Sequence, residues 1–147
     1  LIAESLGKKG KGLFPIVSSM PKDNHSLMQL YLDGPKNNFY TFFDTKENFS
    51  EKVKSATIHE TQKYLRKKSL NDILVSQMLA TQKVFRKKNI PFRGFFIKKR
   101  TEESLGELFS FFVIETILLG RALKVNPYDQ PAVELIKTET KKILLNS

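Results

Sequence analysis

Hydrophobic residues at helical spacing divide much of the chain into amphipathic segments. Apolar positions three and four residues apart predict helices over residues 26–32 and 70–88. The segment 102–124 is apolar around much of its circumference, so it predicts the buried helix of the fold. A last helix is expected to begin at Pro131, because proline suits the first helical position.

Capping and breaking residues mark the ends of these predicted helices. Ser69 followed by Asp72 has the form of a capping box ahead of the helix over 70–88. Thr101 is the expected cap of the next helix. Asp33-Gly34-Pro35 and Asn126-Pro127 each contain proline and are expected to end the helices that precede them. The helix boundaries can therefore be predicted from local signals.

Short apolar and aromatic runs between the helices predict strands at 39–43 and 92–97, and Leu1–Ala3 has the pattern of the end of a buried strand. The polar stretch 45–54 is expected to be a loop. Strands that alternate with helices favour an α/β fold with a mainly parallel sheet.

Composition limits the chemistry and the compartment. A chain of 147 residues fits one domain, and the absence of cysteine excludes disulfides and thiolate metal sites. The longest apolar region, 108–119, is too short and too polar to cross a membrane, and we expect no signal peptide before it. A soluble, cytoplasmic protein is therefore expected. Because the chain starts at Leu1 without methionine, we expect a fragment of something longer.

The net charge of +10 predicts attraction to anions. The basic residues form short clusters, which are expected to be solvated surface, and no nucleic-acid-binding motif accompanies them. A basic nucleic-acid-binding domain remains an alternative to test. The clusters are Lys8-Lys9 with Lys11, Arg66-Lys67-Lys68, Arg86-Lys87-Lys88, Lys98-Lys99-Arg100 and Lys141-Lys142.

The segment NPYDQPAVELIK, residues 126–137, combines a turn, a helix start and a cation. Gln130 lies at the predicted helix N-terminus, where free N–H groups and the helix dipole favour anions. Lys137 lies about two helical turns further along, hence on the same face. This arrangement suits a phosphorylated substrate, although the spacing alone favours a surface lysine on an ordinary amphipathic helix.

Three segments together resemble glucose-6-phosphate isomerases. Residues 126–137 are similar to the family pattern N-P-F-D-Q-P-G-V-E-x-x-K, with Tyr128 and Ala132 as departures. AESLGKKGKGLFP, residues 3–15, is similar to G-E-S-x-G-K-x-x-K-G-x-x-P, with Leu6 and Lys9 as the less common residues. Residues 23–43 resemble the family segment D-x-H-S-x-x-Q-x-x-x-x-G. The three segments follow the family order and span nearly the whole chain.

The resemblance implies roles for four residues. Glu4 matches the catalytic base, which moves a proton between C2 and C1 of the open-chain sugar through an enediol. His25 and Lys137 match residues that act in ring opening, with His25 serving the active site of the partner subunit in a homodimer. Gln130 matches the glutamine beside the phosphate and the sugar. His59 matches no family residue and is expected to be structural or exposed.

The resemblance also implies a fold and a reaction. The expected fold is a three-layer α/β sandwich with a mainly parallel sheet, the C-terminal sugar-isomerase (SIS-type) domain over residues 1–147, incomplete at its N-terminus. The family's phosphate-binding loop and an arginine belong to an N-terminal domain that we do not find in this chain. The implied reaction, in glycolysis and gluconeogenesis, interconverts glucose 6-phosphate and fructose 6-phosphate and needs no metal or organic cofactor. Neither a nucleic acid nor a membrane is expected as a partner. A non-catalytic sugar-phosphate-binding regulatory module is the alternative.

Overall fold

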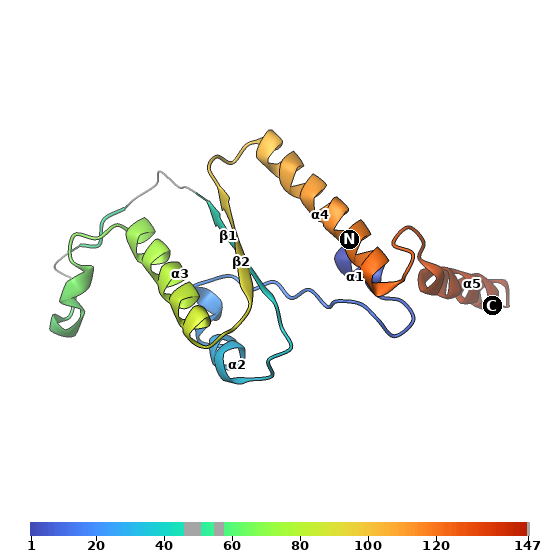
Figure 1. Cartoon of the computed structure of the whole chain (residues 1–147), viewed down its shortest axis with the longest axis horizontal. Coiled ribbons are helices and arrows are strands. Elements are labelled where there is room, and N and C mark those ends of the chain that lie inside the picture. Colours follow the sequence, from blue (N-terminus) through green and yellow to red (C-terminus); the bar gives the residue numbers. More distant parts are fainter. Residues whose placement is uncertain (46–50, 55–57, 147) are drawn as a thin grey trace. The chain divides into compact units, whose positions relative to one another are not determined.

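The computed structural model describes residues 1–45, 51–54 and 58–146, which form two compact units. The central unit is Ser18–Arg100. The terminal unit joins Leu1–Val17 to the chain from Thr101 onward. Each unit is described by itself below, and Figure 1 labels the elements of both.

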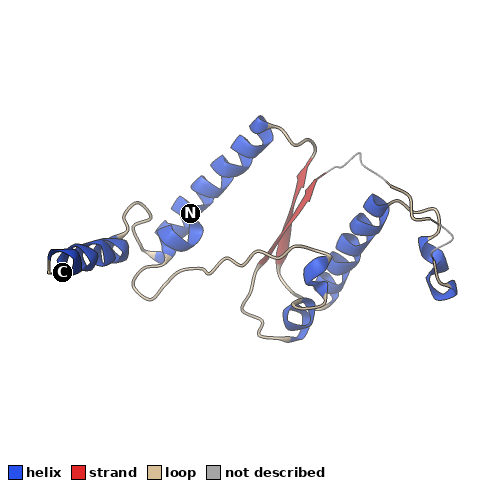
Figure 2. Cartoon of the chain, turned by 180° about the vertical axis from the view of Figure 1, so that it is seen from behind, coloured by secondary structure: helices blue, strands red, loops and turns tan. Residues whose placement is uncertain are grey.

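The central unit contains a small parallel sheet. Strand β1 (Tyr40–Thr45) pairs with β2 (Phe92–Ile97) in register from Tyr40 opposite Phe92 to Thr45 opposite Ile97. Figure 2 shows the two strands side by side, with helices in the chain between them. Parallel strands need a long crossover connection, and here helix α3 (Leu70–Lys87) is part of it. The predicted mixed α/β class and the parallel pairing are confirmed.

Helix α3 begins where the capping signal predicts. The Ser69 hydroxyl accepts a hydrogen bond from the Asp72 N–H at 3.0 Å, and the Asp72 carboxylate accepts one from the Ser69 N–H at 2.9 Å. The capping box is confirmed. The shorter helices of this unit are η1 (Lys22–Asn24), α2 (Met28–Asp33) and η3 (Glu60–Leu65). Helix α2 ends at the predicted Asp33-Gly34-Pro35 stop. The expected loop over 45–54 lies partly outside the described residues, at 46–50.

Aromatic rings form the core of the central unit. The Phe85 side chain from α3 is only 1% exposed. Its ring packs edge-to-face on Tyr40 (centroids 4.9 Å apart), Phe42 (5.6 Å) and Phe92 (6.0 Å). These rings come from both strands, so Phe85 joins the helix to the sheet. The strands need α3 because a two-stranded sheet alone is marginal in water.

The terminal unit is helical. It contains α1 (Ile2–Leu6), α4 (Glu102–Leu123) and α5 (Pro131–Leu145). The predicted cap Thr101 accepts a hydrogen bond from the Ser104 N–H at 3.3 Å, and Pro131 opens the last helix as expected. Helix α1 packs on α4, and the Leu6 side chain is fully buried.

The predicted strand at Leu1–Ala3 is wrong, because these residues enter a helix. The Ser5 N–H donates to the Leu1 carbonyl and the Gly7 N–H donates to the Ala3 carbonyl, both at 2.9 Å. A strand needs a neighbouring strand to pair with, and none of the described residues of this unit forms one. The helix satisfies the backbone within the segment instead.

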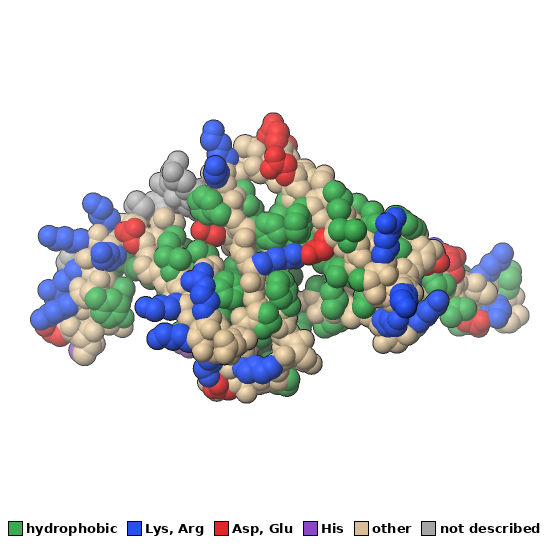
Figure 3. Space-filling model, in the orientation of Figure 1, with side chains coloured by type: hydrophobic (Ala, Val, Ile, Leu, Met, Phe, Trp, Pro, Cys, Tyr) green, Lys and Arg blue, Asp and Glu red, His purple; other side chains and the backbone are tan. Residues whose placement is uncertain are grey.

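Helix α4 is not the buried helix that its composition predicts. Phe109 is 61% exposed and Leu118 is 58% exposed, and among the described residues of α4 only Thr116 and Gly120 are buried. The five-residue helix α1 is too short to cover α4, which has 22 residues. Hydrophobic side chains are visible on the surface of α4 in Figure 3. Within the described part of the chain, no helix has the length and apolar character needed to cross a membrane.

Candidate functional site

Glu4 lies on helix α1, and its side chain is exposed. The expectation that it ends a buried strand is therefore wrong, for the reason given for Leu1–Ala3. The residues that follow, Ser5 and Leu6, are buried against the rest of the terminal unit. Glu4 is thus a solvent-accessible carboxylate on a short helix that is anchored at its C-terminal end.

The glycine-rich loop after α1 is a tight bend. Lys8 and Lys11 pair across it: the Lys11 N–H donates to the Lys8 carbonyl at 2.9 Å, and the Lys8 N–H donates to the Lys11 carbonyl at 3.0 Å. Gly12 has a φ of +137°, which L-residues rarely adopt. A Cβ at Gly12 would lie 2.8 Å from the Gly7 Cα, so the two arms of the loop approach too closely for a side chain.

Two lysine anchors, Lys8 and Lys11, join this loop to the segment after α4. The Lys8 Nζ lies 2.9 Å from Asp129 Oδ1 and also donates to the Asn126 carbonyl. The Lys11 Nζ donates to the Leu123 carbonyl at 2.7 Å. The Lys8 side chain is only 10% exposed, so its charge needs these partners. Residues 3–15 and 126–137, far apart in sequence, therefore meet in one unit.

The contact with Lys8 lowers the pKa of the Asp129 carboxyl. The hydrogen bond from the Lys8 ammonium holds the pKa of the Asp129 carboxyl below its ordinary value of 3.8, with a further contribution from Asn126. A carboxylate that accepts hydrogen bonds from a cation favours its charged form. Asp129 therefore remains ionised at neutral pH and keeps its contact with Lys8.

The segment after α4 is shaped by its own turn. Lys124 ends α4 in the left-handed conformation (φ 57°), and the Val125 N–H donates to the Gly120 carbonyl at 2.9 Å. A Cβ at Gly120 would lie 3.1 Å from Pro127 atoms, so the absence of a side chain lets the proline pack closely. The Tyr128 N–H then donates to Asn126 Oδ1 at 3.1 Å. These contacts direct the chain toward Gln130.

Lys137 lies on the last helix and Gln130 lies at its N-terminal end, as predicted. Gln130 is the N-terminal capping residue of α5, it is exposed, and its side chain makes no capping hydrogen bond. Lys137 is exposed and its Nζ lies 2.6 Å from Glu134 Oε1 on the same helix. Ion pairs at exposed positions are weak, so Lys137 can exchange this partner for another anion.

His25 belongs to the central unit, whereas Glu4, Gln130 and Lys137 belong to the terminal unit. It follows η1 directly and its side chain is exposed. The adjacent turn is organised by Asp23, whose carboxylate accepts a hydrogen bond from the Ser19 N–H at 2.6 Å. The terminal unit thus brings together the segments that carry Glu4, Gln130 and Lys137. The fourth predicted site residue, His25, lies in the other unit.

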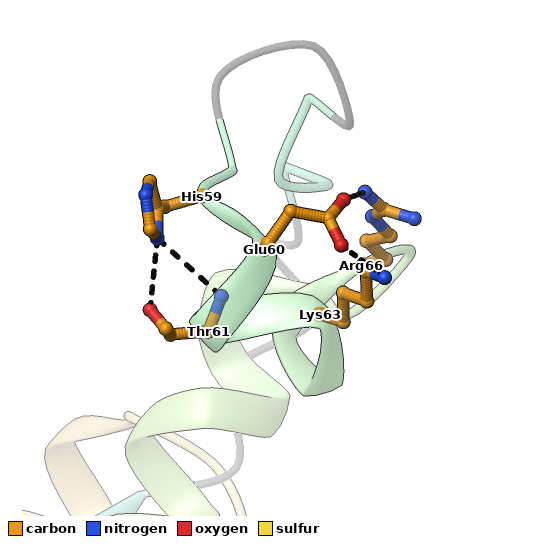
Figure 4. Close-up of polar contacts among 5 residues, drawn as sticks. All are labelled: His59, Glu60, Thr61, Lys63 and Arg66. Carbon is orange, nitrogen blue, oxygen red and sulfur yellow. Dashed lines mark hydrogen bonds and ion pairs between the residues drawn. The ribbon is translucent and has the colours of Figure 1, made fainter.

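His59 has a structural role, as predicted. It is exposed and caps η3: its Nδ1 accepts a hydrogen bond from the Thr61 N–H at 3.4 Å and lies 3.0 Å from Thr61 Oγ1 (Figure 4). On the neighbouring side of the same turn, the Glu60 carboxylate pairs with Lys63 and Arg66. All of these contacts lie within residues 59–66, so they stabilise the turn around η3 locally.

The anchoring role of Lys8 is a feature that the sequence pattern did not reveal. Its cluster is expected to be solvated surface, and for Lys8 this expectation is wrong because its side chain is only 10% exposed and its ammonium contacts Asp129 and the Asn126 carbonyl. The glycines on both sides of the lysines are the available signal, since they predict a tight loop. The acceptors of Lys8 cannot be found from the local sequence, because they follow α4 in the chain, more than a hundred residues after Lys8.

Comparison with known proteins gives relatives along the length of the chain. The probable glucose-6-phosphate isomerase of Methanococcus maripaludis is 31% identical over 148 residues, covering 100% of this chain and 33% of that protein. The glucose-6-phosphate isomerase of Methanocaldococcus jannaschii is 34% identical over 144 residues, covering 97% of this chain and 34% of that protein. That of Mycoplasmopsis synoviae is 38% identical over 141 residues, covering 93% and 33%.

These relatives are all named as isomerases of a phosphorylated sugar. The resemblance to the glucose-6-phosphate isomerase family is confirmed: the chain is a homologue of these proteins over about a third of their length. No protein-family model matches the chain. Among solved structures, a hypothetical protein of Thermus thermophilus superposes with a TM-score of 0.84 at 27% identity, covering 97% of this chain and 36% of that one.

Proposed function

We propose that the chain is the C-terminal sugar-isomerase portion of a glucose-6-phosphate isomerase, which interconverts glucose 6-phosphate and fructose 6-phosphate. One observation carries the proposal beyond the family name. The two segments at opposite ends of the chain that resemble family motifs, 3–15 and 126–137, are joined through Lys8 and Lys11 in one unit. Residues that act on one substrate must be held together, and this contact supplies the means.

In the proposed mechanism Glu4 is the proton carrier. Its carboxylate takes the proton from C2 of the open-chain aldose, an enediol forms, and the proton is returned at C1 to give the ketose. This role needs a carboxylate that a substrate can reach, and Glu4 is exposed at the surface of α1. No metal or organic cofactor takes part in the proposed reaction.

The other residues act on the ring and the phosphate. We assign His25 and Lys137 to ring opening, because an imidazole and an ammonium can move or stabilise protons at the ring oxygen and the C1 hydroxyl. Gln130 is placed beside the phosphate and the sugar, at the N-terminus of α5, where N–H groups favour anions. The net charge of +10 favours the approach of a phosphorylated sugar.

The proposal includes a fold and an assembly. We place β1, β2 and α3 within a three-layer SIS-type sandwich of which this chain carries a part, and we assign the phosphate-binding loop and an arginine to a separate N-terminal domain. The parallel pairing of β1 and β2 supports this placement because sheets of such sandwiches are mainly parallel. We further propose a homodimer in which His25 serves the partner's active site.

A coupled assay tests the proposal. The chain is joined to the N-terminal part of a relative such as the Methanocaldococcus jannaschii enzyme, and conversion of fructose 6-phosphate to glucose 6-phosphate is followed. Glu4→Gln is expected to lower kcat by about 10²–10⁴-fold, the usual contribution of a general base. Glu107→Gln, an exposed carboxylate on α4, is the matched control and should retain full activity.

The possible outcomes separate the proposed function from its alternative. Full activity of Glu4→Gln would contradict the assignment of the base. A folded wild-type protein that binds sugar phosphate by calorimetry and shows no turnover would instead favour the non-catalytic regulatory module.

A further inference from the structure

We propose that Lys8 is a positioning residue: it holds the segment that ends at Gln130 against the loop that follows Glu4. This inference rests on the proposed function, since it concerns how two residues of that site keep a defined separation. Lys8 lies two residues after the end of the helix that carries Glu4, with Gly7 between them, and its partner Asp129 directly precedes Gln130. The contact therefore joins a lysine four residues after Glu4 to the residue that precedes Gln130.

The contact differs from an ordinary surface ion pair. The Lys8 side chain is 10% exposed, and its Nζ has two acceptors in the same segment, Asp129 Oδ1 at 2.9 Å and the Asn126 carbonyl. Two acceptors restrict both the position and the direction of the ammonium group. An exposed pair is usually worth little, and Asp129 is 55% exposed, but the Lys8 side chain is largely covered and would keep a charge without partners if it lost both acceptors. Lys8 therefore favours the closed arrangement of the two segments.

The surrounding backbone is built to present Lys8 in this direction. Lys9 and Gly10 have φ values of 54° and 69°, and the bend closes through paired backbone hydrogen bonds between Lys8 and Lys11. Lys11 then donates to the Leu123 carbonyl at 2.7 Å, at the end of α4. The segment 123–130 is therefore held at two points, by Lys11 at Leu123 and by Lys8 at Asp129, the residue before Gln130. Loss of Lys8 leaves Lys11 to anchor the start of the segment and releases its end.

The consequence for the reaction is geometric. A displacement of about 1 Å between groups that act on one substrate can lower the rate about 10²-fold. Lys8→Met removes the charge and the hydrogen bonds but keeps a long, flexible side chain. We expect it to lower kcat about 10²-fold without abolishing folding. Lys8→Arg keeps a cation that can reach a carboxylate and is expected to restore most of the activity.

The test uses the same joined protein as the proposed function, with Lys9→Met as the matched control. Lys9 is the exposed neighbour in the same bend, so its replacement changes the net charge equally without touching Asp129. Two readouts are followed: kcat and KM in the coupled assay, and the titration of the Asp129 carboxyl by carbon-13 NMR. Lys8→Met should lower kcat and raise the pKa of Asp129, whereas Lys9→Met should change neither.

Each outcome decides one question. An active wild-type protein in which Lys8→Met and Lys9→Met have equal kcat overturns the positioning role and leaves the proposed function standing. An inactive, folded wild-type protein overturns the proposed function itself. If Lys8→Met does not fold, Asp129→Asn provides the second variant, because it removes the charge and keeps an acceptor. A kcat for Asp129→Asn equal to that of the wild type would overturn the inference in that case, and a fall in kcat that Lys9→Met does not show would support it.

Discussion

Replacement of Phe85 by alanine is expected to destabilise the central unit strongly. The side chain is 1% exposed and touches three rings, on β1 and β2. Full burial of a phenylalanine side chain contributes about 1.5–3 kcal/mol, and each edge-to-face ring pair about 0.5–1.5 kcal/mol beyond that. The cavity left by alanine adds a further cost, so the expected loss is about 3–5 kcal/mol, the usual range for this substitution.

Urea denaturation followed by tyrosine fluorescence measures this loss, because the chain has no tryptophan and Tyr40 lies against Phe85. Because the free energy of unfolding falls by about 1–3 kcal/mol for each molar of urea, a loss of about 3–5 kcal/mol should lower the midpoint by about 1–5 M. Phe14→Ala is the matched control, since Phe14 is 86% exposed and its loss should change stability by less than about 0.5 kcal/mol. A loss for Phe85→Ala no larger than that of the control would refute the aromatic core.

Three further outcomes follow from local contacts. Ser69→Ala removes the cap of α3 and should lower the free energy of unfolding by about 0.5–2 kcal/mol in chemical denaturation; an unchanged midpoint would contradict the capping box. Hydrogen bonds from Ser69 hold the pKa of Asp72 below its ordinary value of 3.8, so the stabilisation is complete above that pH and is lost as the pH falls through the lower folded value. The stability difference between wild type and Asp72→Asn should therefore disappear in strong acid, and a difference that persists there would count against this origin. Gly12→Ala combines a φ of +137° with a 2.8 Å approach to Gly7, and should speed amide hydrogen exchange at Lys11; unchanged protection would show that the bend tolerates a side chain.

The sequence predicts candidate residues of the site, but it does not predict the contact that joins their segments. Glu4, His25, Gln130 and Lys137 were selected from motifs, and their assigned roles remain predictions. The contact between Lys8 and Asp129 was not foreseen, because its acceptors lie more than a hundred residues along the chain. A tight glycine-rich loop is a local property, whereas the partner of its lysine is a property of the assembled unit.

The sequence by itself determined the elements with strong local signals. The capping box at Ser69, the strand 92–97 and the helix start at Pro131 are all confirmed, because caps, breakers and aromatic runs act within a few residues. Tertiary structure decided pairing and burial. Leu1–Ala3 lead into helix α1, since none of the described residues of the terminal unit offers a strand to pair with, and α4 keeps exposed apolar side chains because α1 is too short to cover it. Hydrophobicity states what a residue would gain from burial, and only the contacts made by the folded chain decide whether it is buried.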